Sequence, residues 1–232
     1  MFTRVLQAAA LLLLAAMANI VIAQNSSELK TIDDVGGFMK AYYLHPQPNR
    51  IGDVIDALDP TGFLKRPTTA NVVIGFFSEI FAANPNRLPE WQSYIAKQDD
   101  QTRATLERAL AVSKSGGVLN NSRHSAGLND ACWAAFFATG NPKFVDKIID
   151  ELRYFDERND EGLFFSGATA KWSLASNARD QPAVRSAIEN AKVTADKRTR
   201  ELITELLSED LVRIKQEIEE VVKTQRDAGQ WK

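Results

Sequence analysis

Two segments, PNRIGDVIDAL (residues 48–58) and PKFVDKIIDEL (residues 142–152), decide the fold class of this chain. In each segment, four apolar side chains follow the proline at helical spacing. They are Ile51, Val54, Ile55 and Leu58 in the first segment, and Val145, Ile148, Ile149 and Leu152 in the second. This spacing places all four on one stripe of an α-helix, and such a stripe must be buried against another element. Both segments therefore predict an amphipathic helix that begins near its proline.

The same kind of helix recurs after Pro85 and Pro182. An aromatic-rich segment lies upstream of each of the first three of these four prolines, and Trp172 alone lies upstream of Pro182. Asn-Pro pairs, such as Asn84-Pro85 and Asn141-Pro142, are typical of helix starts, because Asn caps free amides and Pro has none to satisfy. We interpret each unit as an aromatic helix, a tight polar turn and an aliphatic helix. Four approximate copies are expected, near residues 34–59, 71–97, 129–155 and 167–195.

Repeated helical hairpins that cannot bury their apolar stripe alone are typical of stacked helical arrays. In this respect the chain resembles the tetratricopeptide and HEAT-type superhelical proteins. The segments GFFSEIFAANP, WAAFFATGNP and KWSLASNA also resemble an uncharacterised family of exported bacterial proteins. The expected fold is all-α, with stacked antiparallel helical hairpins in an α-solenoid-like arrangement. The alternative is an irregular all-helical domain.

The run from Lys192 to Arg226 contains no Gly or Pro, and its apolar residues keep helical spacing with charged residues between them. It predicts one long C-terminal amphipathic helix. Such a helix caps the open end of a helical array, or it pairs with the same helix of a second chain to form a homodimer.

Residues 1–23 have the composition of a secretory signal: one positive charge, Arg4, and then an apolar run that ends at Ala23. We expect cleavage after Ala23 and export to the periplasm or the medium. The alternative is an uncleaved membrane anchor over residues 5–23. The mature chain is expected to have an N-terminal hairpin half over 24–112 and a C-terminal half over 130–232.

The two expected halves are joined by residues 113–129, which are rich in Ser, Gly and Asn. Loops of this length within compact domains are usually functional or disordered. The segment is therefore interpreted as a flexible linker, with a binding loop as the alternative.

The composition excludes several classes of protein. With 44% hydrophobic and 25% charged residues, the chain is an ordinary globular protein. A net charge of -2 argues against nucleic acid as a partner, and one Cys excludes a disulfide framework. No phosphate loop, calcium loop or zinc-ligand spacing is present, so no cofactor and no metal are expected.

The candidates for chemistry are few. His45 lies in a turn, and His124 lies in the segment 113–129 beside Ser122 and Ser125. Cys132 has no nearby basic residue to activate its thiol and is expected to be a buried small hydrophobe. No motif identifies catalytic residues, and an enzyme is less expected than a binding protein.

The first functional hypothesis is an exported helical scaffold that binds a protein or peptide in the cell envelope. Its candidate contact residues are Tyr42, His45, Phe77, Trp91, His124, Trp133 and Trp172. The second hypothesis is a hydrolase or small-ligand-binding protein with a site under residues 113–129, in which His124 acts with Ser122 or Ser125. A membrane-tethered interaction protein is the third, if residues 5–23 are retained.

Overall fold

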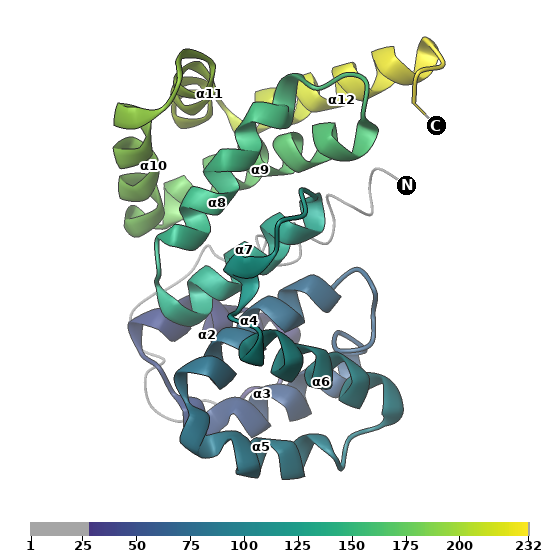
Figure 1. Cartoon of the computed structure of the whole chain (residues 1–232), viewed down its shortest axis with the longest axis vertical. Coiled ribbons are helices and arrows are strands. Elements are labelled where there is room, and N and C mark those ends of the chain that lie inside the picture. Colours follow the sequence, from purple (N-terminus) through teal and green to yellow (C-terminus); the bar gives the residue numbers. More distant parts are fainter. Residues whose placement is uncertain (1–27, 232) are drawn as a thin grey trace. The chain divides into compact units, whose positions relative to one another are not determined.

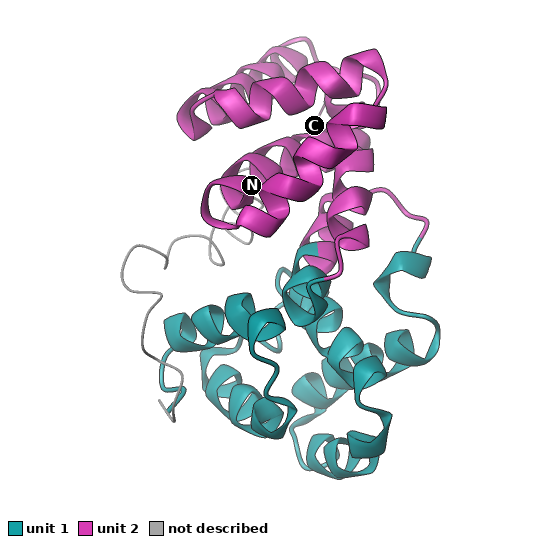
Figure 2. Ribbon diagram, turned by 90° about the vertical axis from the view of Figure 1, so that its left-hand side faces the viewer, with its two compact units in different colours: residues 1–121, 133–140 teal, residues 122–132, 141–232 magenta. Residues whose placement is uncertain are grey.

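The computed structural model describes residues 28–231, which form eleven α-helices and no strand (Figure 1). The all-α class is therefore confirmed. The expected signal segment over residues 1–23 lies outside the described residues. The described chain divides into two compact units (Figure 2), and helix α7 (Ala126–Thr139) contributes residues to both of them.

Unit 1 comprises residues 28–121 and 133–140. Besides the end of α7, its α-helices are α2 (Ile32–Ala41), α3 (Ile51–Leu58), α4 (Ala70–Ala83), α5 (Leu88–Ile95) and α6 (Asp100–Lys114). Single turns of 3-10 helix lie between them: η1 (Tyr42–Leu44), η2 (Pro48–Arg50), η3 (Asp59–Thr61), η4 (Pro85–Arg87) and η5 (Val118–Asn120). The segment 113–129 thus contains the end of α6, the turn η5 and the start of α7.

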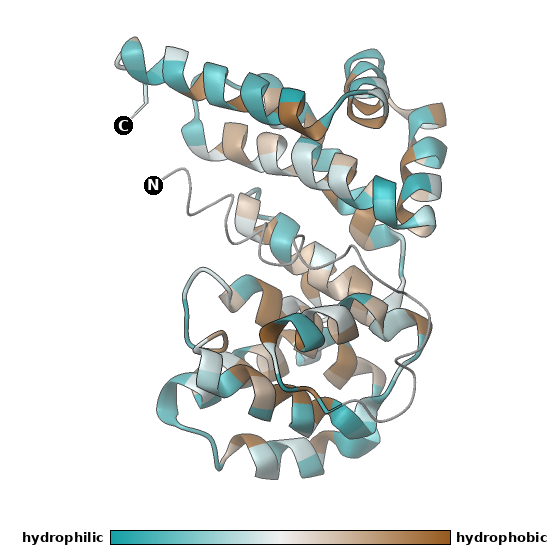
Figure 3. Cartoon of the chain, turned by 180° about the vertical axis from the view of Figure 1, so that it is seen from behind, coloured by the Kyte–Doolittle hydropathy of each residue, from teal (hydrophilic) through white to brown (hydrophobic). Residues whose placement is uncertain are grey.

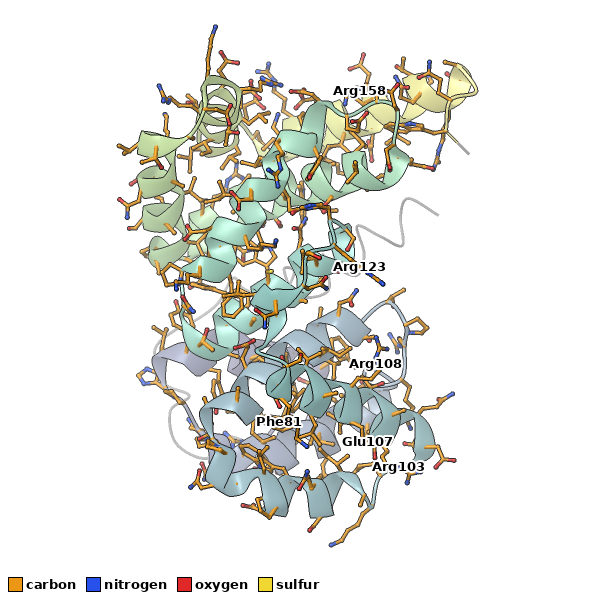
Figure 4. All side chains as sticks on the ribbon, in the orientation of Figure 1. Phe81, Arg103, Glu107, Arg108, Arg123 and Arg158 are labelled. Carbon is orange, nitrogen blue, oxygen red and sulfur yellow. The ribbon has the colours of Figure 1, made fainter. Side chains whose placement is uncertain are left out.

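Helix α4 is the centre of unit 1, because most of its residues are buried. Burial runs without a break from Val72 to Ser78 and includes Ile80 and Phe81. The helix packs against α6, and Phe81 lies inside the unit with no exposed surface (Figure 4). The predicted stripe of the first segment is confirmed here, since the four apolar residues of α3 are the ones that are buried.

Unit 2 comprises residues 122–132 and 141–231. Its elements after α7 are α8 (Lys143–Glu151), η6 (Leu152–Asp156), α9 (Glu161–Asp180), α10 (Pro182–Thr194), α11 (Lys197–Ser208) and α12 (Leu211–Asp227). Helix α9 packs against η6, α8, α10, α11 and α12. The spacing of the prolines predicts consecutive hairpins, but it does not indicate that α9 is the central helix of the unit.

The predicted single helix over residues 192–226 is divided in the structure into the end of α10, α11 and α12. The reason is local: Asp196 accepts a hydrogen bond from the amide of Thr199, and Asp210 accepts one from the amide of Val212. Each aspartate thereby caps a new helix start. Hydrophobic and hydrophilic residues alternate along α12 (Figure 3), and its apolar residues Ile214, Ile218 and Val222 are buried in this chain.

A buried lysine ties the last two helices to α9. Lys171 has no exposed surface, and its Nζ donates to Glu205 of α11 at 2.9 Å and to Glu217 of α12 at 2.8 Å. The same ammonium group lies 4.3 Å from the centre of the Phe155 ring. One cation on the central helix therefore fixes both C-terminal helices.

Trp231, the last described residue, returns to the body of unit 2. Its Nε1 donates to the carbonyl oxygen of Arg158 at 3.0 Å, and its ring lies 4.9 Å from that of Phe164. Arg158 lies in the turn between η6 and α9 (Figure 4). Trp231 is thus held in place by an aromatic contact and a hydrogen bond.

Candidate functional site

The candidate site lies within unit 2, around His124. This residue directly precedes Ser125, whose Oγ accepts a hydrogen bond from the amide of Leu128 at 3.1 Å. Ser125 therefore caps the start of α7, which fixes the backbone beside His124. The imidazole is partly exposed, with 30% of its side-chain surface accessible.

Glu151 at the end of α8 is the partner of His124. Its side chain has no exposed surface, and its Oε1 lies 2.7 Å from Nδ1 of His124. Its other oxygen, Oε2, accepts a hydrogen bond from Oγ of Ser166 at 2.6 Å. A buried carboxylate is costly unless it is paired, and here both oxygens have a partner.

A glycine brings Ser166 close to Glu151. A β-carbon at Gly167 would overlap the backbone of Tyr154 and Phe155, so only glycine permits this approach of α9 to η6. Because Ser166 is the preceding residue, the same close approach places its hydroxyl group beside the carboxylate at the end of α8.

Asn129 of α7 supports the site from the other side of Ser166. Its Nδ2 donates to the carbonyl oxygen of Ser166 at 2.8 Å and to Oγ1 of Thr169 at 2.9 Å. Helices α7, α8 and α9 are therefore joined by one hydrogen-bonded chain that runs from Asn129 through Ser166 and Glu151 to His124.

An aromatic ring lies on one side of the imidazole. The ring centres of His124 and Tyr154 are 4.9 Å apart with a 51° tilt, and the guanidinium of Arg153 lies 5.0 Å from the centre of the Tyr154 ring. The ring contact and the hydrogen bond to Glu151 together restrict rotation of the imidazole.

This arrangement determines what His124 can do. An ionised carboxylate can only accept, so a neutral imidazole paired with ionised Glu151 carries its proton on Nδ1 and donates it to the carboxylate. Nε2 then holds the lone pair, which is the form that accepts a proton from a bound molecule. Glu151 also stabilises the imidazolium that forms when Nε2 is protonated.

Four of the seven predicted contact residues are buried aromatic side chains of unit 1: Tyr42, Phe77, Trp91 and Trp133. Each lies with its ring against other rings, for example Tyr42 against Phe76 and Trp91 against Phe81. Buried rings present no face to a partner in this structure. Burial also raises the pKa of Tyr42 to about 12.

The other three predicted residues are more accessible. His45 is exposed and belongs to unit 1, whereas Trp172 is half-buried in α9 and belongs to unit 2 with His124. The seven residues are therefore divided between the two units, with His124 and Trp172 in unit 2 and the other five in unit 1. Cys132 is buried, as predicted.

The residues that complete the site are not among the predicted ones. The hydroxyl group of the network comes from Ser166, whereas Ser122 is exposed and Ser125 caps α7. One signal is present for Glu151: it follows Ile148 by three residues, which places a carboxylate on the apolar stripe of α8. Nothing in the sequence indicates that Ser166 or Asn129 would meet it.

One further titratable group, Asp130, directly follows the site residue Asn129 in α7. Asp130 is half-buried, and desolvation of its carboxyl group raises the pKa to about 7. Within residues 28–231, no group of three His, Cys, Asp or Glu side chains is placed to hold a metal ion. In the same described range, no helix has the length and hydropathy needed to cross a membrane.

Comparisons with known protein families, with curated proteins and with solved structures give no match to this chain.

Proposed function

We propose that unit 2 is a hydrolase centre in which His124 acts as the general base. The observation that carries the proposal is the 2.7 Å contact between Nδ1 of His124 and Oε1 of Glu151, with Glu151 fully buried and held by Ser166. When a fixed carboxylate holds Nδ1 of an imidazole, Nε2 is left to act as the base, and this arrangement is suited to the activation of water.

In the proposed reaction, Nε2 removes a proton from a water molecule while the water oxygen attacks the carbonyl carbon of a small ester. The imidazolium then returns this proton to the leaving alcohol as the acyl–oxygen bond breaks. The products are a carboxylic acid and an alcohol, and His124 is regenerated. Glu151 takes no proton in these steps, and its role is to orient and stabilise the imidazole.

Hydrolysis of small aryl esters, beginning with p-nitrophenyl acetate, tests this proposal. His124→Gln should lower the rate by about 100-fold, the usual contribution of a general base. His45→Gln is the matched control, because it changes the other histidine of the chain, which is exposed and lies in unit 1. Equal rates in the two variants, or no turnover by the unchanged protein above buffer, would contradict the proposal.

The second candidate function is the exported scaffold that binds a protein or peptide in the cell envelope. Leu44 supports it, since this large apolar side chain is 54% exposed and adjoins the exposed His45 in unit 1. Exposed apolar side chains of this size are candidates for a partner contact. Capture of a stoichiometric partner from the envelope fraction by the unchanged protein, with loss of that partner in Leu44→Glu, would support this function. Amino-terminal sequencing of the exported protein tests cleavage after Ala23.

A further inference from the structure

One buried atom of the site has no partner within the described chain. Oδ1 of Asn129 is inaccessible to solvent and accepts no hydrogen bond from the described residues, and the residue as a whole is only 2% exposed. An unpaired acceptor in this position is unfavourable, and buried polar atoms in native proteins are nearly always paired with protein or with water.

The orientation of the amide is fixed by its neighbours. The Ser166 carbonyl oxygen can only accept, so the atom of Asn129 that faces it at 2.8 Å must be the donating Nδ2. The hydroxyl group of Thr169 lies 2.8 Å from the carbonyl oxygen of Phe165, to which it donates, and it therefore accepts from Nδ2 of Asn129. Rotating the amide by half a turn would place two oxygens together. Oδ1 is consequently the unpaired atom.

We infer that Asn129 Oδ1 binds an internal water molecule, which is a fixed component of the His124 site. A water molecule supplies the missing donor, and buried waters typically serve buried polar groups that the chain leaves unpaired. Ser166 contacts both Asn129 and Glu151, so this water site is one residue removed from the carboxylate that orients His124. The inference goes beyond the proposed function, because it holds whether or not His124 transfers a proton.

A high-resolution crystal structure of the full chain tests the inference directly. The expected result is an ordered water within hydrogen-bond distance of Asn129 Oδ1, with Nδ2 still directed at Ser166. An empty position, a protein donor at Oδ1 or a reversed amide would each overturn the inference.

Water relaxation dispersion in solution gives an independent count of long-lived internal waters. We expect Asn129→Leu to lose about one such water relative to the unchanged protein, since its side chain has no acceptor. Thr169→Val is the matched control, because it removes one partner of Nδ2 and leaves Oδ1 in place, so its count should not change. If Asn129→Leu does not fold, the crystal structure of the unchanged protein decides: an ordered water beside Asn129 Oδ1 supports the inference, and an empty position overturns it.

Discussion

Nδ1 of His124 and Oε1 of Glu151 lie 2.7 Å apart, although 27 positions separate the two residues in the sequence. The contact depends on three separate features: the serine cap that fixes the start of α7, the burial of the carboxylate at the end of α8, and the glycine that lets α9 approach η6. Each can be changed by a single substitution.

Glu151→Gln should strongly reduce the rate of ester hydrolysis while leaving the chain folded. Glutamine has nearly the same shape, but its amide group can donate to Nδ1, which favours the tautomer with the proton on Nε2. The lone pair needed for proton removal is then lost, and the rate should fall by about 100-fold or more. Steady-state rates, together with circular dichroism as a check on folding, measure this. A folded variant with an unchanged rate would show that Glu151 has no role in orienting the base.

Gly167→Ala should destabilise unit 2, because its β-carbon would overlap the backbone of η6. Overpacking of this kind costs roughly 1–3 kcal/mol, and more where backbone must move. Chemical denaturation gives the free energy of unfolding. Gly36→Ala in α2 is the control: nothing lies within 4 Å of its added carbon, so it should raise stability by roughly 0.5–1 kcal/mol. Similar effects of the two substitutions would argue against the close contact of α9 with η6.

Removing the carboxylates that hold Lys171 should cost more than replacing the lysine itself. The double variant Glu205→Gln, Glu217→Gln leaves a buried ammonium group without a countercharge, at a cost of about 2 kcal/mol once partial exposure of the glutamates is allowed for. Lys171→Met keeps a similar volume and should change stability less. Thermal unfolding measures both, with the exposed Glu219→Gln as the control. A larger loss in Lys171→Met than in the double variant would contradict this ordering.

Asp130 should make stability depend on pH in a defined direction. The pKa of its carboxyl group is about 7 in the folded chain and close to 3.8 in the unfolded chain. Between pH 3.8 and pH 7, the folded chain therefore keeps a proton on Asp130 that the unfolded chain has lost. Stability should therefore fall as the pH rises from 4 towards 7, and ionised Asp130 is unfavourable above that. At high pH, Asp130→Asn should be more stable than the unchanged protein by roughly 2 kcal/mol, which raises its melting temperature by a few degrees. The difference in stability should vanish at low pH. The exposed Asp227→Asn should show no such trend; an equal trend in both variants would exclude Asp130 as its source.

The sequence predicts the helices well where apolar spacing alone determines burial. The stripes of α3 and α8 are buried as expected, and α10 begins at its proline, because these features depend only on neighbouring residues. The division of residues 192–226 does not follow from the same spacing, since the caps Asp196 and Asp210 also fit the polar face of one continuous helix.

The sequence predicts the site only in part. It indicates His124, but an acid partner so distant in the sequence can be found only from tertiary packing, and the hydroxyl group belongs to Ser166. For the aromatic residues, the sequence does not distinguish a binding groove from a core, because the same rings suit both. The rings of Tyr42, Phe77, Trp91 and Trp133 are buried in the structure.

The tautomer of His124 is the most direct test of the proposed general base, and it requires no substrate. Long-range nitrogen–proton correlation NMR, at a pH where the imidazole is neutral, distinguishes a protonated ring nitrogen from one with a lone pair. We predict that His124 carries its proton on Nδ1 and has its lone pair on Nε2, and that Glu151→Gln reverses the two. A proton on Nε2 of His124 in the unchanged protein would contradict the proposed role of His124 as a general base oriented by Glu151.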